Sequence, residues 1–110
     1  MDGLGSKLVA LYIVINAGFA DEVMDIARDA GAKGATIINA RGEGPMHKSI
    51  LGITVDSEKE IIIMLIESDT AENIMLAIKA NAGLGFPSQG VCYTLPVDKT
   101  TLVNNFSEEE

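Results

Sequence analysis

The segment Glu60-Ile-Ile-Ile-Met-Leu-Ile-Glu67 decides the fold of this chain. Its six consecutive apolar residues, four of them β-branched, are too few for a free-standing helix and predict a strand. Side chains of a strand alternate between two faces, so this strand is apolar on both of its sides. Residues 7–15 repeat the same pattern.

The rest of the chain offers only two helical patterns, which are enough to cover one face of a sheet. The second apolar face must then be covered by another molecule, and a second copy of the same chain is the simplest candidate. The sequence therefore predicts an oligomer before it indicates any chemistry.

Composition limits the possible functions. The 110 residues predict a single domain over 1–110, with a folded core over 7–98 and an acidic tail over 104–110. A formal charge of −8 argues against nucleic acid and anionic membranes as partners. The single cysteine, Cys92, excludes an internal disulfide framework and a cysteine-based zinc site. We expect a cytoplasmic protein without direct membrane insertion, because no segment reaches the roughly 18 apolar residues of a membrane span.

The expected elements alternate in a recognisable order. They are a strand over 7–15, a helix over 20–30, a strand over 36–41, a third strand over 50–55 and 60–67 that bends or breaks at 56–57, a helix over 68–82 and a strand over 91–97. The order βαββαβ is that of ferredoxin-like α+β folds, with an antiparallel sheet and both helices on one face.

Local signals mark the ends of these elements. Gly31 is expected to be a left-handed cap after the first helix. Asp69 and Glu72 suit a capping box at the start of the second helix, and Gly83 ends it. Pro96 marks the end of the last strand or an exposed edge.

Enzymatic chemistry finds no support in the sequence. His47 is the only histidine, and no serine, cysteine or aspartate around it forms a nucleophile motif. Acylphosphatases share the order of elements, but they bind phosphate with an arginine after the first strand, and residues 16–19 contain none. The histidine and carboxylates also show neither zinc-type nor EF-hand spacing. We therefore expect no catalytic residues, no resident metal and no required cofactor.

Two loops are the candidate binding sites. In the first, Arg41, His47 and Lys48 gather positive charge in an acidic protein, and Gly42 and Gly44 can expose backbone N–H groups to an anion. The alternative is a flexible hairpin loop with solvated charges.

The second candidate loop covers residues 83–90. It combines glycines with Ser88 and Gln89 as hydrogen-bonding groups, and it ends at Gly90. A tight helix-to-strand connection is the alternative. Both loops can lie at lateral edges of the sheet, where edges of different subunits can face each other across a cleft.

The segment Gly34-Ala-Thr-Ile-Ile-Asn-Ala-Arg-Gly-Glu-Gly44, with residues 19–25 and 90–98, resembles the PII signal-transduction family of nitrogen regulators. The similarity extends over residues 7–98. It implies a ferredoxin-like subunit, a compact homotrimer and adenine nucleotides (ATP, ADP or AMP) bound in the clefts between subunits. It also implies a regulatory role in which the loop after the second strand docks on a partner protein such as a membrane transporter or an enzyme.

The resemblance assigns roles to particular residues. Thr36 stands where the family contacts the adenine, Gly42 and Gly44 stand at the root of the effector loop, and Gly90 opens the last strand beside the phosphates.

The sequence departs from the family pattern at several positions, and these differences limit the functions that the resemblance implies. The effector loop is short and lacks a tyrosine, so classical uridylylation is not implied. Val91 replaces a phosphate-contacting lysine, Pro45 replaces a glutamine used in 2-oxoglutarate sensing, and the basic C-terminal segment is absent. A metal-tolerance protein of the CutA type, or a ligand-free interaction module of the same fold, is therefore the alternative.

Overall fold

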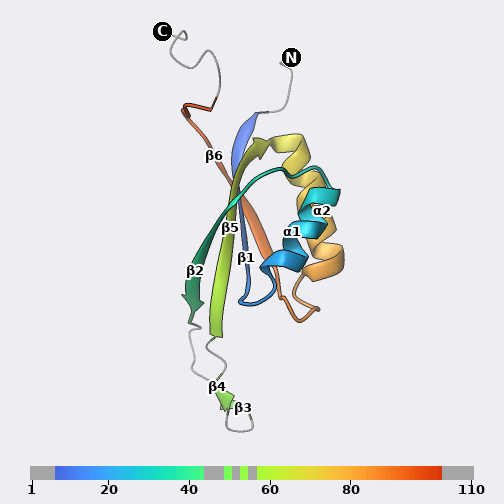
Figure 1. The fold of residues 1–110 in the computed structure, drawn as a ribbon, viewed down its shortest axis with the longest axis vertical. Coiled ribbons are helices and arrows are strands. Elements are labelled where there is room, and N and C mark those ends of the chain that lie inside the picture. The colour runs from blue at the N-terminus through green and yellow to red at the C-terminus, as the bar shows by residue number, and fades with distance from the viewer. Residues whose placement is uncertain (1–6, 44–48, 51–52, 55–56, 103–110) are drawn as a thin grey trace.

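The computed structural model describes residues 7–43, 49–50, 53–54 and 57–102. Figure 1 shows a long sheet with two helices beside it. The elements in chain order are β1 (Leu8–Asn16), α1 (Ala20–Asp29), β2 (Thr36–Gly42), β3 (Ser49–Ile50), β4 (Ile53–Thr54), β5 (Ser57–Glu67), α2 (Ser68–Ala82) and β6 (Val91–Pro96). The predicted ferredoxin-like arrangement is confirmed.

The main sheet has the strand order β2-β5-β1-β6, and every neighbouring pair is antiparallel. Ile13 of β1 lies opposite Ile62 of β5 on one side and Cys92 of β6 on the other. The apolar segment that opens the sequence thus forms most of a central strand. A central strand needs both of its faces covered, which explains its continuous apolar run.

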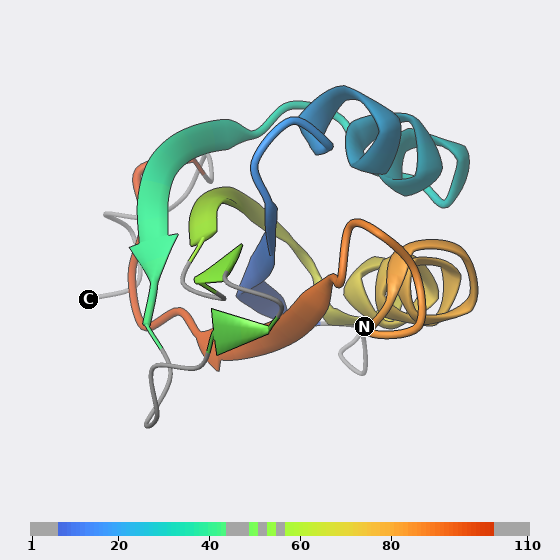
Figure 2. The same ribbon diagram turned by 90° about the horizontal axis from the view of Figure 1, so that it is seen from below.

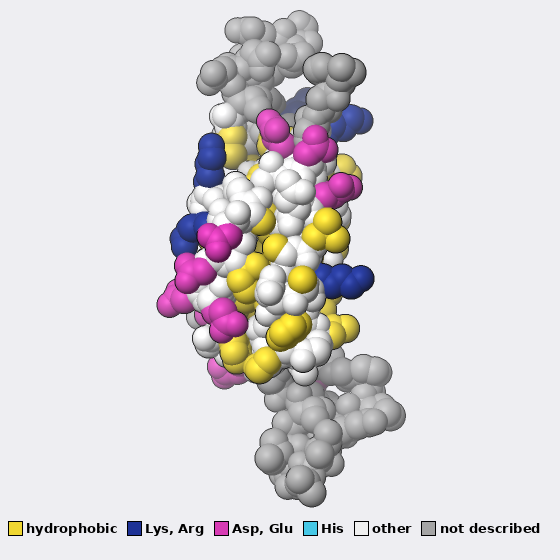
Figure 3. Space-filling model, turned by 90° about the vertical axis from the view of Figure 1, so that its right-hand side faces the viewer, with side chains coloured by type: hydrophobic (Ala, Val, Ile, Leu, Met, Phe, Trp, Pro, Cys, Tyr) yellow, Lys and Arg dark blue, Asp and Glu magenta, His cyan; other side chains and the backbone are white. Residues whose placement is uncertain are grey.

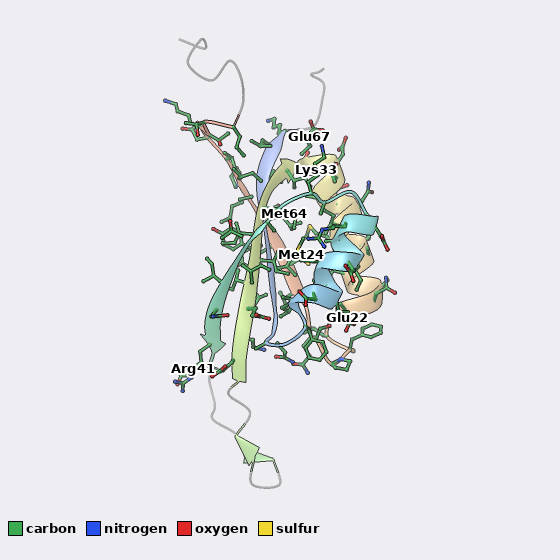
Figure 4. All side chains as sticks on the ribbon, viewed as in Figure 1. Glu22, Met24, Lys33, Arg41, Met64 and Glu67 are labelled. Carbon is green, nitrogen blue, oxygen red and sulfur yellow. The ribbon has the colours of Figure 1, made fainter. Side chains whose placement is uncertain are left out.

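Both helices lie on the same side of the sheet, as the end-on view in Figure 2 shows. The face that they cover forms the core, where alternate residues of β1 and β5 are fully buried against α1 and α2. Met24 of α1 and Met64 of β5 lie between the two layers (Figure 4). The buried residues are Leu11, Ile13, Ile15, Ala20, Val23, Met24, Ala27, Ala32, Ile62, Met64, Ala71, Ile74, Ile78 and Ala82.

The opposite face of the sheet, which we call the open face, is apolar, and none of the described helices covers it. Tyr12 and Tyr93 stack there across neighbouring strands, with ring centroids 5.4 Å apart. Large apolar side chains around them are exposed: Ile38, Leu65, Val91 and Leu95. The expectation that two helices cover only one of two apolar faces is confirmed.

The third strand was wrongly predicted. Instead of continuing from residue 50 into β5, the chain forms a separate two-stranded sheet in which Ile50 of β3 pairs with Ile53 of β4. The apolar residues at 50–55 alternate as a strand does, and alternation cannot distinguish one strand from the two arms of a short hairpin. The glycine at position 52 is the signal for the reversal.

The helix ends partly follow the sequence signals. Gly31 has φ +117°, so the expected left-handed glycine after α1 is confirmed. The capping box at Asp69 and Glu72 was wrong, because the N-cap of α2 is Glu67 and it makes no side-chain capping bond. β5 runs directly into α2, which leaves no room for a separate cap residue.

Acidic residues line the outer surface of α1, where Asp21, Glu22, Asp25 and Asp29 are all exposed. Figure 3 views the helix layer and shows acidic side chains gathered on one side of it, with exposed apolar side chains beside them. Within the described residues, no helix is long and apolar enough to span a bilayer.

Candidate functional site

The two predicted loops meet the sheet at the same end. Arg41 and Gly42 are the last residues of β2, and Figure 4 shows Arg41 at the lower tip of that strand, away from the helices. Arg41 is exposed and makes no ion pair with any other described residue. It lines a shallow hollow together with Asn39, Glu58 and Lys59. A guanidinium that has no carboxylate partner is available to an anion.

A second cation, Lys59, lies beside the end of β2. Its half-buried side chain crosses Gly42, where an added Cβ would come within 2.8 Å of the lysine Cε. A Cβ at Gly42 would push the flexible end of the lysine side chain aside, so the glycine allows this close approach. The Lys59 ammonium donates a hydrogen bond to Oδ1 of Asn16 at 2.7 Å, and its other two N–H groups make no bond to a described residue.

Asn16, the last residue of β1, joins this lysine to the loop over 83–90. Its backbone N–H donates to the Ser88 carbonyl at 2.9 Å, and its side-chain amide donates to the Pro87 carbonyl at 2.8 Å. A single side chain therefore connects the loop before β6 to Lys59 and, through it, to the root of the loop after β2. We call Asn16, Gly42 and Lys59 the loop bridge.

Ser88 and Gly90 serve the fold in the single chain. The Ser88 hydroxyl is buried and donates to the carbonyl of Ala82 at 2.9 Å. The Gly90 N–H donates to the same carbonyl at 2.6 Å. Both groups donate to a backbone carbonyl at the end of α2 that has no partner within the helix. The Ser88 hydroxyl is therefore already bonded in the single chain, and its role as a ligand contact stays a prediction.

Gln89 and Thr36 expose their side chains at different places. Gln89 follows a turn and has φ +48° in the left-handed region, and its exposed side chain makes no hydrogen bond to another described residue. Thr36 begins β2 on the open face, five residues before Arg41. Five residues of strand span roughly 17 Å, so one chain does not bring Thr36 to the loop bridge.

The remaining predicted site residues, Gly44, His47 and Lys48, lie outside the described residues. Sequence reasoning missed Asn16 and Lys59. Lys59 stands between two glutamates at the start of an apolar strand, and only the register of β5 against β1 and β2 shows that it meets Asn16 and Gly42. A lysine in an otherwise acidic segment was the available signal.

Metal and thiol chemistry find no centre in the described part of the chain. No three cysteine, aspartate or glutamate side chains in that part come together as a metal site. Cys92 packs against the core, and burial raises the pKa of its thiol from the ordinary 9.0 to about 11. Such a thiol is a packing group, not a nucleophile.

The folded protein should protect Cys92 from thiol reagents. A pKa higher by two units lowers the thiolate fraction at pH 8 roughly 100-fold, so we expect modification by Ellman's reagent to be slower by about that factor than in urea. The folded state also keeps the proton where the unfolded state has lost it. Stability should therefore decrease as pH rises from about 9 towards 11. Equal modification rates in both states at pH 8 would contradict this assignment.

Comparison with known proteins identifies the family. The profile of the family described as Nitrogen regulatory protein P-II matches residues 8–105. This chain belongs to the PII family. A curated relative, the nitrogen fixation nifHD region glnB-like protein 1 of Methanococcus maripaludis, is 28% identical over 100 residues, which cover 86% of this chain and 91% of the relative.

Solved PII structures share the fold. B. subtilis GlnK superposes with a TM-score of 0.67 at 16% identity, covering 86% of this chain and 89% of GlnK. A B. subtilis GlnK–ATP complex gives 0.66 at 15% identity, with 86% and 84% covered. Arabidopsis thaliana PII bound to citrate gives 0.62 at 22% identity, with 84% and 78% covered. The family is one of regulatory proteins, which agrees with the expectation that this chain is not an enzyme.

Proposed function

We propose that this PII protein is a homotrimeric regulator that binds an adenine nucleotide in the clefts between its subunits. The bound nucleotide sets the shape of the loop after β2, and that loop controls a partner protein, either a transporter or an enzyme. The observation that supports this proposal best is the loop bridge, which physically connects both candidate loops at a point where two cations are available.

Two cations at the end of the sheet can each contact an anion. Arg41 lies opposite Glu58, and Lys59 is the next residue of β5, so the two cations lie on opposite faces at the end of the sheet. Both retain N–H donors that bond to no described residue. Glu58 lines the hollow beside Arg41. Glu60, two residues further along β5, is bonded elsewhere: its carboxylate accepts a hydrogen bond from the Gly18 N–H at 3.1 Å. Charge-assisted hydrogen bonds from lysine and arginine are the strong contacts that proteins make with phosphate.

The open face supports self-association. It spans the four strands of the main sheet, and its exposed apolar residues come from β2, β5 and β6. Apolar patches of this kind on a monomer mark interaction surfaces. Thr36 lies on this face, away from the loop bridge of its own chain, so a second copy is needed to place a Thr36 beside it.

Titration calorimetry with ATP, ADP and AMP tests the proposal. We expect saturable binding of at least one of them and a roughly tenfold or greater loss of affinity in Lys59→Met, because a hydrogen bond to a charged group contributes about 1.5–3 kcal/mol. Lys7→Met is the matched control, since Lys7 precedes the opposite end of β1 and its exposed side chain lies away from the loop bridge.

The possible results distinguish the role of the loop bridge from nucleotide binding itself. An equal loss of affinity in both lysine variants would show a general charge effect and would remove the assigned role of the loop bridge. Absence of heat and of any thermal shift with all three nucleotides would overturn nucleotide binding itself. At a hundredfold excess over Kd, a bound ligand should stabilise the fold by about 2.7 kcal/mol, which is easily measured.

A further inference from the structure

A groove runs along the outer surface of the helix layer, between α1 and α2. It has a volume of about 630 Å³, and its floor is formed by Ile26 and Ala30 of α1 and Ala77 of α2. All three floor residues are partly buried, and Figure 3 shows apolar side chains along the middle of this layer. An apolar groove between two helices is a surface on which a third helix can pack.

The two walls of this groove differ in charge. α1 contributes the three carboxylates of Glu22, Asp25 and Asp29, whereas α2 contributes the uncharged amide of Asn81. The acidic positions are three and four residues apart, so they form one stripe that follows the groove for roughly 10 Å. Acidic side chains are gathered along this side of the layer in Figure 3. The groove is therefore apolar on its floor and negative along one wall.

The carboxylate stripe does not stabilise α1. Asp25 lies four residues before Asp29, and like charges at this spacing repel each other. Asp29 is the last residue of α1, where the helix dipole disfavours an anion. Arg28, the only basic residue of α1, contacts Asp25 at 3.7 Å, so Glu22 and Asp29 form no ion pair with any described residue. Residues that oppose the stability of their own helix are typical of a functional surface.

We propose that this groove is a docking site for a basic amphipathic helix of a partner protein. The lysine or arginine side chains of that helix, three and four residues apart, pair with the carboxylate stripe, and its apolar side chains pack on the floor of the groove. The inference is independent of nucleotide binding, because no residue that lines the groove belongs to the loop bridge. Failure of either proposal leaves the other intact.

The occupant is another protein because this chain does not supply a basic helix. Residues 1–6 and 103–110 contain neither lysine nor arginine, so neither terminal segment complements the groove. The two long helices carry one basic residue each, Arg28 and Lys79, so a second copy offers no basic stripe. A single metal ion does not fit either, since no three carboxylates of the described residues come together as a metal site.

Fluorescence anisotropy with a labelled peptide tests the docking site. The probe is a peptide of about 18 residues that repeats leucine and lysine at helical spacing, and the comparison peptide has the same composition in scrambled order. We expect the full chain to bind the probe at least about tenfold more tightly than the scrambled peptide. Equal binding would show a general charge attraction and would overturn the inference. Absence of binding up to about 1 mM probe would overturn it as well.

Two pairs of charge variants locate the bound peptide. Glu22→Gln with Asp29→Asn removes two carboxylates from the groove, whereas Glu72→Gln with Asp98→Asn removes two exposed carboxylates that do not line it. We expect the first pair to weaken binding of the probe roughly tenfold and the second pair less than about twofold. Equal losses in the two pairs would contradict binding in this groove.

The stability of a single variant separates binding from a structural role. Asp29→Asn removes an anion from the C-terminal end of α1, so its midpoint of urea unfolding should equal or exceed that of the unchanged protein. The same variant should weaken binding of the probe about threefold. A lower midpoint would show that the Asp29 carboxylate serves the fold, and would overturn its assignment to a partner.

A variant of the floor tests the apolar part of the contact. Ala77→Phe places an aromatic ring in the groove and should weaken binding of the probe at least about tenfold. Ala80→Phe, at an exposed position of the same helix, should bind the probe like the unchanged protein. Equal affinity of the two variants would contradict the contact. The charge variants alter only exposed positions, so they decide the question if Ala77→Phe does not fold.

Discussion

Leu65→Glu is expected to weaken self-association at least roughly 100-fold, since burying an uncompensated carboxylate costs several kcal/mol. Leu65 lies on the open face, where it is level with Ala10 of β1 and Leu95 of β6. It is 38% exposed in the single chain, so glutamate there reaches water as long as the chain is alone. Association of the open faces would remove that water from a carboxylate in every subunit.

Sedimentation equilibrium across micromolar concentrations measures this effect. Ala80→Glu is the control, because it adds the same charge to an exposed position of α2. We expect Ala80→Glu to associate like the unchanged protein, and Leu65→Glu to sediment as a monomer with an unaltered circular dichroism spectrum. A Leu65→Glu protein that remains trimeric would show that the open face is not the interface.

Gly90→Ala should destabilise the fold by about 1–3 kcal/mol, the typical cost of forcing extra atoms into a packed site. An added Cβ would lie 2.8 Å from the Ala82 carbonyl oxygen and 3.1 Å from Cγ2 of Ile78. That oxygen cannot retreat freely, because it accepts hydrogen bonds from the Gly90 N–H and the Ser88 hydroxyl. The end of α2 and the start of β6 must therefore separate.

Urea unfolding followed by circular dichroism measures this loss. Gly85→Ala is the matched control from the same loop, because an added Cβ at Gly85 meets no heavy atom within 4 Å. Its effect should stay within about 0.5 kcal/mol. If Gly90→Ala were as stable as Gly85→Ala, the glycine at 90 would owe its presence to ligand binding and not to packing.

Most of the main fold was predictable because it depends on local patterns. The apolar runs of β1 and β5, the helical spacing of Val23 with Ala27, and the left-handed Gly31 are each set within a few residues. The β3–β4 hairpin was not predictable in the same way. Whether residues 50–55 extend β5 or fold back on themselves depends on competition between pairings, which the pattern of one segment does not contain.

The candidate site also has a part that local sequence predicts and a part that depends on tertiary contacts. The sequence pointed to both loops and to Arg41 as a cation, since residue type and glycine spacing are visible in the chain. The loop bridge was hidden, because Asn16 and Lys59 are separated by more than forty residues and neither belongs to a motif. The bond of Ser88 was hidden for a similar reason: a serine in a loop gives no sign that its hydroxyl is already bonded to Ala82.

The sequence by itself determined that this chain forms a two-sided apolar sheet covered by helices on one face only, because alternation and helical spacing are properties of neighbouring residues. The tertiary structure alone decided which side chains meet at the end of that sheet. Strand register aligns Asn16 and Lys59, and it places Arg41 opposite Glu58. Register is set by the packing of the whole sheet against its helices, and a shift of one residue would turn every one of these side chains to the other face.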